Sequence, residues 1–143
     1  MISSVDSNLL VYAHNTNAPE HEVCSAFIKR LLESGEQVLI LHQTLFELFS
    51  ILTNPIIVSK PNPAQAWKIC RYYSSHGALQ TASYEAPVFL IIQELLDENM
   101  QHGRRFFDLV LAATLKHHGV QRFYTRNERH FRQYSFLEVI NPL

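Results

Sequence analysis

The sequence predicts an α/β fold of three layers (α/β/α), in which a central, mainly parallel sheet lies between two layers of helices. Short apolar runs of strand length alternate with longer segments whose apolar residues recur at helical spacing. The 143 residues are 47% hydrophobic and 17% charged, which is typical of a folded domain with a sizeable core. Because no linker, internal repeat or low-complexity segment divides the chain, we expect a single domain over residues 1–143.

Proline, glycine and asparagine mark the element boundaries in the first half of the chain. Pro19 suits the first turn of a helix that ends before Gly35. Asn54-Pro55 closes another helix, which is apolar on almost every side. The elements expected here are a strand ending at Asp6, helices at 9–13 and 20–32, a strand at 38–41, a helix at 42–53, a loop at 56–63 and a helix at 64–75.

In the second half, Gly103 separates two predicted helices and Gly119 is a suitable cap for the second of them. The first of these helices has an apolar stripe that includes Val88, Ile91 and Leu95. The elements expected here are a strand at 79–81, helices at 85–100 and 104–118, a strand at 122–125, a short helix at 126–131 and an edge strand at 136–140.

Charge is distributed unevenly along the chain. The formal net charge is -1, but residues 1–103 carry 5 Lys/Arg and 10 Asp/Glu, whereas residues 104–143 carry 7 and 3. A basic C-terminal segment could bind phosphates, although it could equally be a solvated face.

The cysteines and the absence of long apolar stretches indicate the compartment. Cys24 and Cys70 match no metal or redox spacing, so we expect buried free thiols in a reducing environment. No apolar stretch approaches the ~18 residues of a membrane span, and no basic flank precedes an apolar segment at the N-terminus. We therefore expect a cytoplasmic protein with no membrane segment.

Three acidic residues are candidates for a shared site. Asp6 follows a strand, where ligands bind in open α/β sheets, but it could simply cap the next helix. Asp108 lies near the start of an otherwise apolar helix face, where a cap or an ion pair with Arg104 or Arg105 would also explain it. If these two acids converge with a third, oxygen ligands of this kind suit Mg2+ or Mn2+ rather than zinc.

The third acid is Glu47, in the apolar helix at 42–53. It shares a narrow polar stripe with Gln43, Ser50 and Asn54, which could also face water. The eight histidines form no zinc motif, and adjacent His117 and His118 are expected to point to different sides of a helix end.

Several segments together resemble the PIN-domain ribonucleases, and in particular the VapC-type toxins of toxin–antitoxin pairs. They are Val5-Asp6-Ser7-Asn8, Glu47 in its apolar helix, the run from Phe107 to Thr114, and Tyr124-Thr125-Arg126-Asn127 with Phe131. The resemblance covers essentially the whole chain. It implies metal-dependent cleavage of RNA, a homodimer, and inhibition by a cognate antitoxin protein.

The resemblance also assigns roles to residues. Asp6, Glu47 and Asp108 match the three main metal-site acids of the family, and Asn127 matches a fourth position that is often Asp. His130 stands where many members have a further acid, so these two departures leave open whether one or two metal ions bind.

The sequence therefore predicts an endoribonuclease that hydrolyses RNA phosphodiesters with Mg2+ or Mn2+. Asp6, Glu47 and Asp108 would bind the metal, and Asn127 would complete the ligand set or hold a water. The remaining roles are orientation of the carboxylates by Ser7, Asn8 and Thr125, and phosphate contacts by Arg126 and Arg104.

Two other classes of protein remain open at this point. A phosphatase could use Asp6 as its nucleophile, but such sites commonly need a second acid two residues on, where Asn8 stands. A PIN-like module could also bind RNA or protein without cutting, and the Asn127 and His130 departures favour this alternative.

Overall fold

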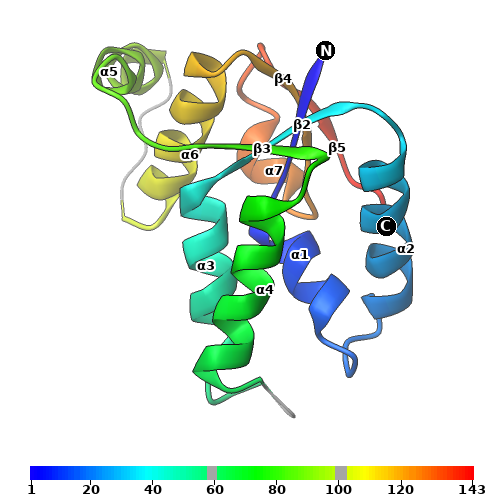
Figure 1. Cartoon of the computed structure of the whole chain (residues 1–143). Coiled ribbons are helices and arrows are strands. Elements are labelled where there is room, and N and C mark those ends of the chain that lie inside the picture. Colours follow the sequence, from blue (N-terminus) through cyan, green and yellow to red (C-terminus); the bar gives the residue numbers. More distant parts are fainter. Residues whose placement is uncertain (58–60, 99–102) are drawn as a thin grey trace.

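The computed structural model describes residues 1–57, 61–98 and 103–143, and it contains a parallel sheet flanked by helices (Figure 1). The strand order in this sheet is β3-β2-β1-β4-β5, and every pairing is parallel. The predicted fold class is therefore confirmed. The elements are β1 (Ile2–Val5), α1 (Ser7–His14), α2 (His21–Glu33), β2 (Gln37–Leu41), α3 (His42–Leu52), α4 (Pro63–Ser75), β3 (Leu79–Ala82), α5 (Val88–Glu98), α6 (Arg105–His117), β4 (Val120–Tyr124), α7 (Glu128–Phe131) and β5 (Glu138–Ile140).

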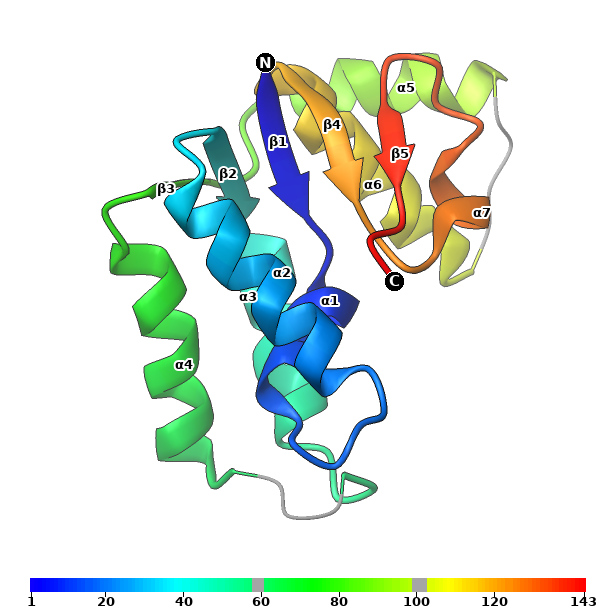
Figure 2. The same ribbon diagram turned by 90° about the vertical axis from the view of Figure 1, so that its right-hand side faces the viewer.

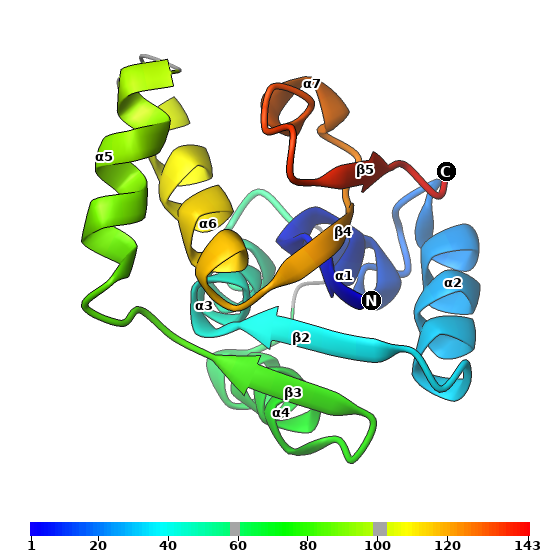
Figure 3. The same cartoon turned by 90° about the horizontal axis from the view of Figure 1, so that it is seen from above.

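The sheet separates two hydrophobic cores, one on each face (Figure 3). Strand β2 contributes to both, because side chains alternate along a strand: Val38 and Ile40 join the core with α1–α4, whereas Leu39 and Leu41 join the core with α5, α6 and α7. Cys24 and Cys70 are buried free thiols in the first core, as predicted.

Strand β1 lies at the centre of the sheet, between β2 and β4, and the arrows of β1, β4 and β5 point the same way (Figure 2). Its end is in register with the end of β4, since Val5 pairs with Tyr124 and the Asp6 amide donates to the Tyr124 carbonyl at 2.9 Å. The residues that follow these two strands, Asp6 and Thr125, are consequently side by side at one edge of the sheet.

Some element boundaries differ from the prediction. Helix α5 begins at Val88 and not at Glu85, because Pro87 disfavours the helical conformation for the residue before it. The predicted end of this helix, Met100, and part of the predicted 56–63 loop lie outside the described residues. No helix in the described part of the chain is both long and apolar enough to span a membrane.

Candidate metal centre

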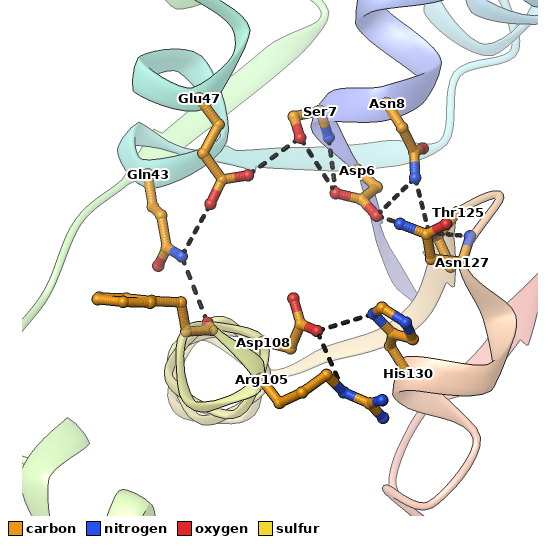
Figure 4. Close-up of polar contacts among 11 residues, drawn as sticks. Asp6, Ser7, Asn8, Gln43, Glu47, Arg105, Asp108, Thr125, Asn127 and His130 are labelled. Carbon is orange, nitrogen blue, oxygen red and sulfur yellow. Dashed lines mark hydrogen bonds and ion pairs between the residues drawn. The ribbon is translucent and has the colours of Figure 1, made fainter. Parts of the chain in front are cut away.

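The Asp6 carboxylate is fixed by donors from two strand ends (Figure 4). Asp6 is the N-cap of α1, and its side chain accepts from the Ser7 amide at 2.8 Å. The same carboxylate accepts from Asn8 Nδ2 at 3.1 Å and from the Thr125 hydroxyl at 2.6 Å. Asp6 does cap a helix, but donors other than the helix amide also hold it in place.

Burial makes Asp6 electrostatically unusual. Only 6% of the residue is exposed, and this burial raises the pKa of the Asp6 carboxyl from 3.8 to about 6. The hydrogen bonds from Thr125 and Ser7 lower the pKa, whereas the charges of Glu47 and Asp108 raise it further. Glu47 and Asp108 therefore each lie close enough to Asp6 to disfavour its ionised form.

Glu47 reaches the same region from α3. Its Oε2 accepts from the Ser7 hydroxyl at 3.0 Å, and Ser7 Oγ also lies 3.4 Å from Asp6 Oδ1. Gln43 Nε2 donates to Glu47 Oε1 at 3.1 Å, while Tyr84 OH donates to Gln43 Oε1 at 2.6 Å. One Ser7 side chain thus connects two of the acids, and a Tyr84–Gln43 chain supports Glu47 from the other side.

The polar stripe on α3 divides between two environments. Gln43 and Glu47 are half-buried and point toward the acids, whereas Ser50 and Asn54 are exposed to solvent. The water-facing alternative is therefore correct only for the C-terminal part of the stripe.

Asp108 lies in the first turn of α6, and its side chain points toward the space that Asp6 and Glu47 also face (Figure 4). Its Oδ2 is 2.9 Å from His130 Nδ1 and 3.9 Å from Arg105 Nε. Burial raises the pKa of Asp108, and the neighbouring His130 and Arg105 oppose that rise. An ion pair with Arg105 exists, but it is long and half-exposed, and His130 is the nearer partner.

Thr125 is fully buried and links three segments of the site. Its hydroxyl donates to Asp6 and accepts from Asn8 Nδ2 at 3.4 Å and from the Asn127 amide at 2.9 Å. Asn127 precedes α7 as its N-cap, but its side chain makes no capping hydrogen bond. Its contact with Thr125 is made by the main chain, which leaves the exposed side-chain amide available to a ligand.

Arg126 has partners that the sequence did not indicate. Its Nη1 binds the Glu20 carboxylate and the Tyr12 hydroxyl, the latter at 2.9 Å, and its guanidinium lies over the Tyr12 ring at 5.2 Å. The Arg126 amide donates to Asn8 Oδ1 at 3.4 Å. Because Asn8 also binds Asp6, Arg126 lies beside the site that Asp6, Glu47 and Asp108 form. Arg104 is exposed immediately before α6.

A basic hollow of about 420 Å3 lies next to the acids. Among its lining residues, His130 contacts Asp108, whereas the Asn127 and Arg126 amides bind Thr125 and Asn8, two of the residues that hold Asp6. The full lining is Arg126, Asn127, Glu128, Arg129, His130 and Arg132. Its basic side chains belong to the positively charged C-terminal segment, so this end of the sheet presents carboxylates beside cationic groups suited to a phosphate chain.

The chemistry of the donors fits a hard divalent cation. Asp6, Glu47 and Asp108 supply carboxylate oxygens, and Asn127 could add an amide oxygen. Mg2+ and Mn2+ prefer such ligands. A cation would also offset the burial and the nearby Glu47 and Asp108 charges, which together raise the pKa of Asp6.

The chain belongs to the PIN-domain family, since the family model described as PIN domain matches residues 4–137. It is 33% identical over 141 residues to Ribonuclease VapC24 of Mycobacterium tuberculosis, which covers 98% of this chain and 96% of that protein. Two crystal structures share the fold. One is VapC20 of Mycobacterium tuberculosis, a Sarcin-Ricin loop cleaving toxin (TM-score 0.68, 16% identity, 92% of this chain and 95% of that one). The other is VapBC2 from Rickettsia felis, bound to a DNA fragment from their promoter (TM-score 0.69, 19% identity, 99% and 98%).

Three supporting residues of the site were not predicted from the sequence. Gln43 was placed on the same helical stripe as Glu47 but was given no role in the site, although side chains four residues apart on a helix are neighbours. His130 was noted only as a departure from an acidic position, although it contacts Asp108 directly. Tyr84 gave no signal, because its contact with Gln43 depends on how the segment after β3 packs against α3.

Proposed function

We propose that this PIN-domain protein is a divalent-metal-dependent endoribonuclease, with Asp6, Glu47 and Asp108 as ligands of Mg2+ or Mn2+. The observation that carries the proposal is the convergence of these acids from the end of β1, from α3 and from α6. Burial is the main cause of the raised pKa of Asp6, and the charges of Glu47 and Asp108 add to it. The 33% sequence identity to Ribonuclease VapC24, over 98% of this chain, supports RNA as the substrate.

In this mechanism most residues position groups rather than react. Ser7, Asn8 and Thr125 hold the Asp6 carboxylate, and Ser7 also orients Glu47. The bound ion would supply an activated water and neutralise the charge that develops on the phosphodiester. Asn127 completes the ligand set or holds a water, and Arg126 and Arg104 contact phosphates of the RNA.

His130 distinguishes this site from one built only of acids. With Nδ1 placed 2.9 Å from Asp108 Oδ2, it orients that carboxylate and leaves Oδ1 for a metal ion. A second metal ion would have to bind at the positions of His130 and Asn127. Neither of these side chains is an anionic ligand, so the second ion would have fewer anionic ligands than the first. We therefore propose that a single ion is sufficient for cleavage by this protein.

We also propose a cognate antitoxin protein as partner, a homodimeric assembly and a cytoplasmic location. The support for the antitoxin is the similarity to VapC24 and the fold shared with the VapBC2 complex of Rickettsia felis. A toxin of this class would be held inactive by its partner until the partner is lost, and would then cut cellular RNA.

The test is cleavage of end-labelled total cellular RNA by metal-free protein, with and without added Mg2+ or Mn2+. We expect cleavage only with added ion, and none by Glu47→Gln under any condition. Glu22→Gln, an exposed acid in the first turn of α2, is the matched control and should cut normally. Tight RNA binding without cleavage in both ions would instead favour the non-cutting module, and metal-independent cleavage would contradict the assigned ligands.

A further inference from the structure

A second cluster of ligand-type side chains lies at the other end of α6, away from Asp108. His117 is the last residue of α6, His118 is its C-cap, and Glu85 precedes α5. His117 Nε2 is 2.8 Å from Glu85 Oε2, and His118 Nε2 is 4.0 Å from Glu85 Oε1. The adjacent histidines therefore turn toward the same carboxylate, which corrects the expectation that they point to different sides of the helix end.

The three ligand atoms come close enough to share one ion. One atom each from Glu85, His117 and His118 lies within 4.8 Å of the other two. A tetrahedral zinc site with bonds of about 2.0–2.2 Å requires ligand atoms roughly 3.3 Å apart. The closure needed is small, and the Glu85 side chain, which is 57% exposed, is free to make it.

The donor set differs in chemistry from the carboxylate site. Two imidazoles and one carboxylate are ligands that Zn2+ and similar transition metals prefer, whereas Mg2+ favours oxygen alone. The position is also favourable for a cation, because the C-terminus of α6 carries the negative end of the helix dipole. We propose that Glu85, His117 and His118 form a second metal site, selective for a Zn2+-class ion and separate from the catalytic acids.

The two sites are far enough apart to be studied independently. Asp108 and His117 are nine residues apart on one helix, which corresponds to roughly 14 Å along its axis at 1.5 Å per residue. The second site therefore shares no ligand with the first, and it can be tested in protein whose catalytic acids have been replaced.

Metal binding would replace two hydrogen bonds. His118 Nε2 lies 3.0 Å from the Ser83 carbonyl oxygen, a contact that needs a proton on Nε2. Coordination through Nε2 requires that proton to leave, so the ring exchanges the Ser83 carbonyl for the ion. The His117–Glu85 hydrogen bond is likewise replaced by two metal–ligand bonds. The ion would then join the turn before α5 to the end of α6, two helices that already pack together.

The test measures binding of Co2+, a spectroscopic substitute for Zn2+, to the Asp6→Asn/Asp108→Asn double variant, in which the first site is disabled. We expect one equivalent of Co2+ to give the intense visible absorption of four-coordinate cobalt with nitrogen ligands, and Zn2+ to displace it. Zn2+ should also raise the thermal midpoint of this variant with concentration. Adding His117→Ala or His118→Ala should weaken binding at least about tenfold.

Two further variants keep the result interpretable. His76→Ala replaces another half-buried histidine at a helix C-cap and should leave the Co2+ spectrum unchanged. Glu85→Gln changes an exposed side chain, so it should fold normally and still weaken Co2+ binding even if a histidine variant does not fold. Unaltered Co2+ binding in folded His117→Ala/His118→Ala protein, or the absence of the four-coordinate spectrum in the parent, would overturn the proposal. Neither outcome depends on RNA cleavage, so failure here is distinct from failure of the proposed function.

Discussion

Asp6 and Asp108 face the same space but are held in different ways. Asp6 is buried and bound by neutral donors, namely a main-chain amide, an asparagine amide and the Thr125 hydroxyl. Asp108 is half-exposed and is held by the side chains of His130 and Arg105. Neutral donors fix a carboxylate without cancelling its charge, whereas cationic partners offset part of it.

This difference indicates which of the two acids destabilises the metal-free fold more when it is ionised. The pKa of Asp6 is raised to about 6, chiefly by burial, so the metal-free fold is destabilised when Asp6 ionises. Asp108 has His130 and Arg105 as neighbours, and both oppose the rise in its pKa. In the proposed metal site, Asp6 is therefore the acid whose ionised form a bound cation would stabilise most.

The largest effects are expected for Asp6→Asn. It should reduce RNA cleavage at least about a hundredfold, because a metal ligand is lost. Folded protein holds the Asp6 proton up to a pH of about 6 but unfolded protein only up to about 3.8, so metal-free wild type should lose stability as pH rises between these values. The loss is on the order of 3 kcal/mol. Urea unfolding of Asp6→Asn between pH 4 and 7 should not show this pH-dependent loss of stability. A pH dependence equal to that of wild type would refute the assignment of the loss to Asp6.

Asp108→Asn should abolish cleavage but affect stability much less. The substitution removes one negative charge from the acid cluster and also removes the partner of His130 and Arg105, so the two effects oppose each other. We expect metal-free stability at pH 7 to be equal to or slightly above that of wild type, with the pH slope retained. The measurement is unfolding and RNA cleavage on one preparation. A destabilised but active variant would falsify the catalytic assignment.

Thr125→Val should have an intermediate effect, mainly through Asp6, and it also removes the acceptor of the Asn127 amide. It removes the 2.6 Å hydrogen bond that lowers the pKa of Asp6, so the pH-dependent loss of stability should move to higher pH. Binding of Mn2+, followed by the thermal midpoint, should weaken about 10- to 100-fold. Thr53→Val, at the C-cap of α3, is the matched control and should bind Mn2+ normally. Normal binding by Thr125→Val would mean that Thr125 does not orient Asp6.

The smallest effect is expected for Arg126→Ala. It should weaken RNA binding less than about tenfold and reduce the slope of log K against log salt by about one, because one phosphate contact is lost. Arg122→Ala, whose side chain pairs with Glu138, is the control. Glu20→Gln should act in the opposite direction, since it frees the Arg126 guanidinium for phosphate. A salt slope that neither variant changes would remove Arg126 from the RNA-binding residues.

The sequence predicted best what depends on local signals and on the geometry of parallel strands. Pro19, Gly35 and Gly119 predicted helix ends, and each lies within two residues of the corresponding end of α2 or α6 in the structure. Asp6 and Thr125 could be expected to meet because parallel strands end at one edge of the sheet. Phe107, by contrast, is an apolar residue that its type alone would place in the core, yet it is 60% exposed, since α6 buries its other faces.

Side-chain contacts between segments far apart in the sequence were the part that sequence reasoning could not supply. The Arg126–Glu20 pair joins residues 106 positions apart, and the His117–Glu85 pair joins residues 32 apart. Each depends on how far a side chain extends beyond its own element and on the angle at which the elements pack. Neither quantity is encoded in the local spacing of apolar residues.

The central position of β1 affects when the protein can act during its own synthesis. The first strand made is the middle of the sheet, and it must wait for β4, which pairs beside it. The hydrogen bond between Thr125 and Asp6 spans 119 positions, so the acids cannot be fixed until nearly the whole chain has left the ribosome. A nascent or prematurely terminated chain would therefore lack the assembled candidate metal centre.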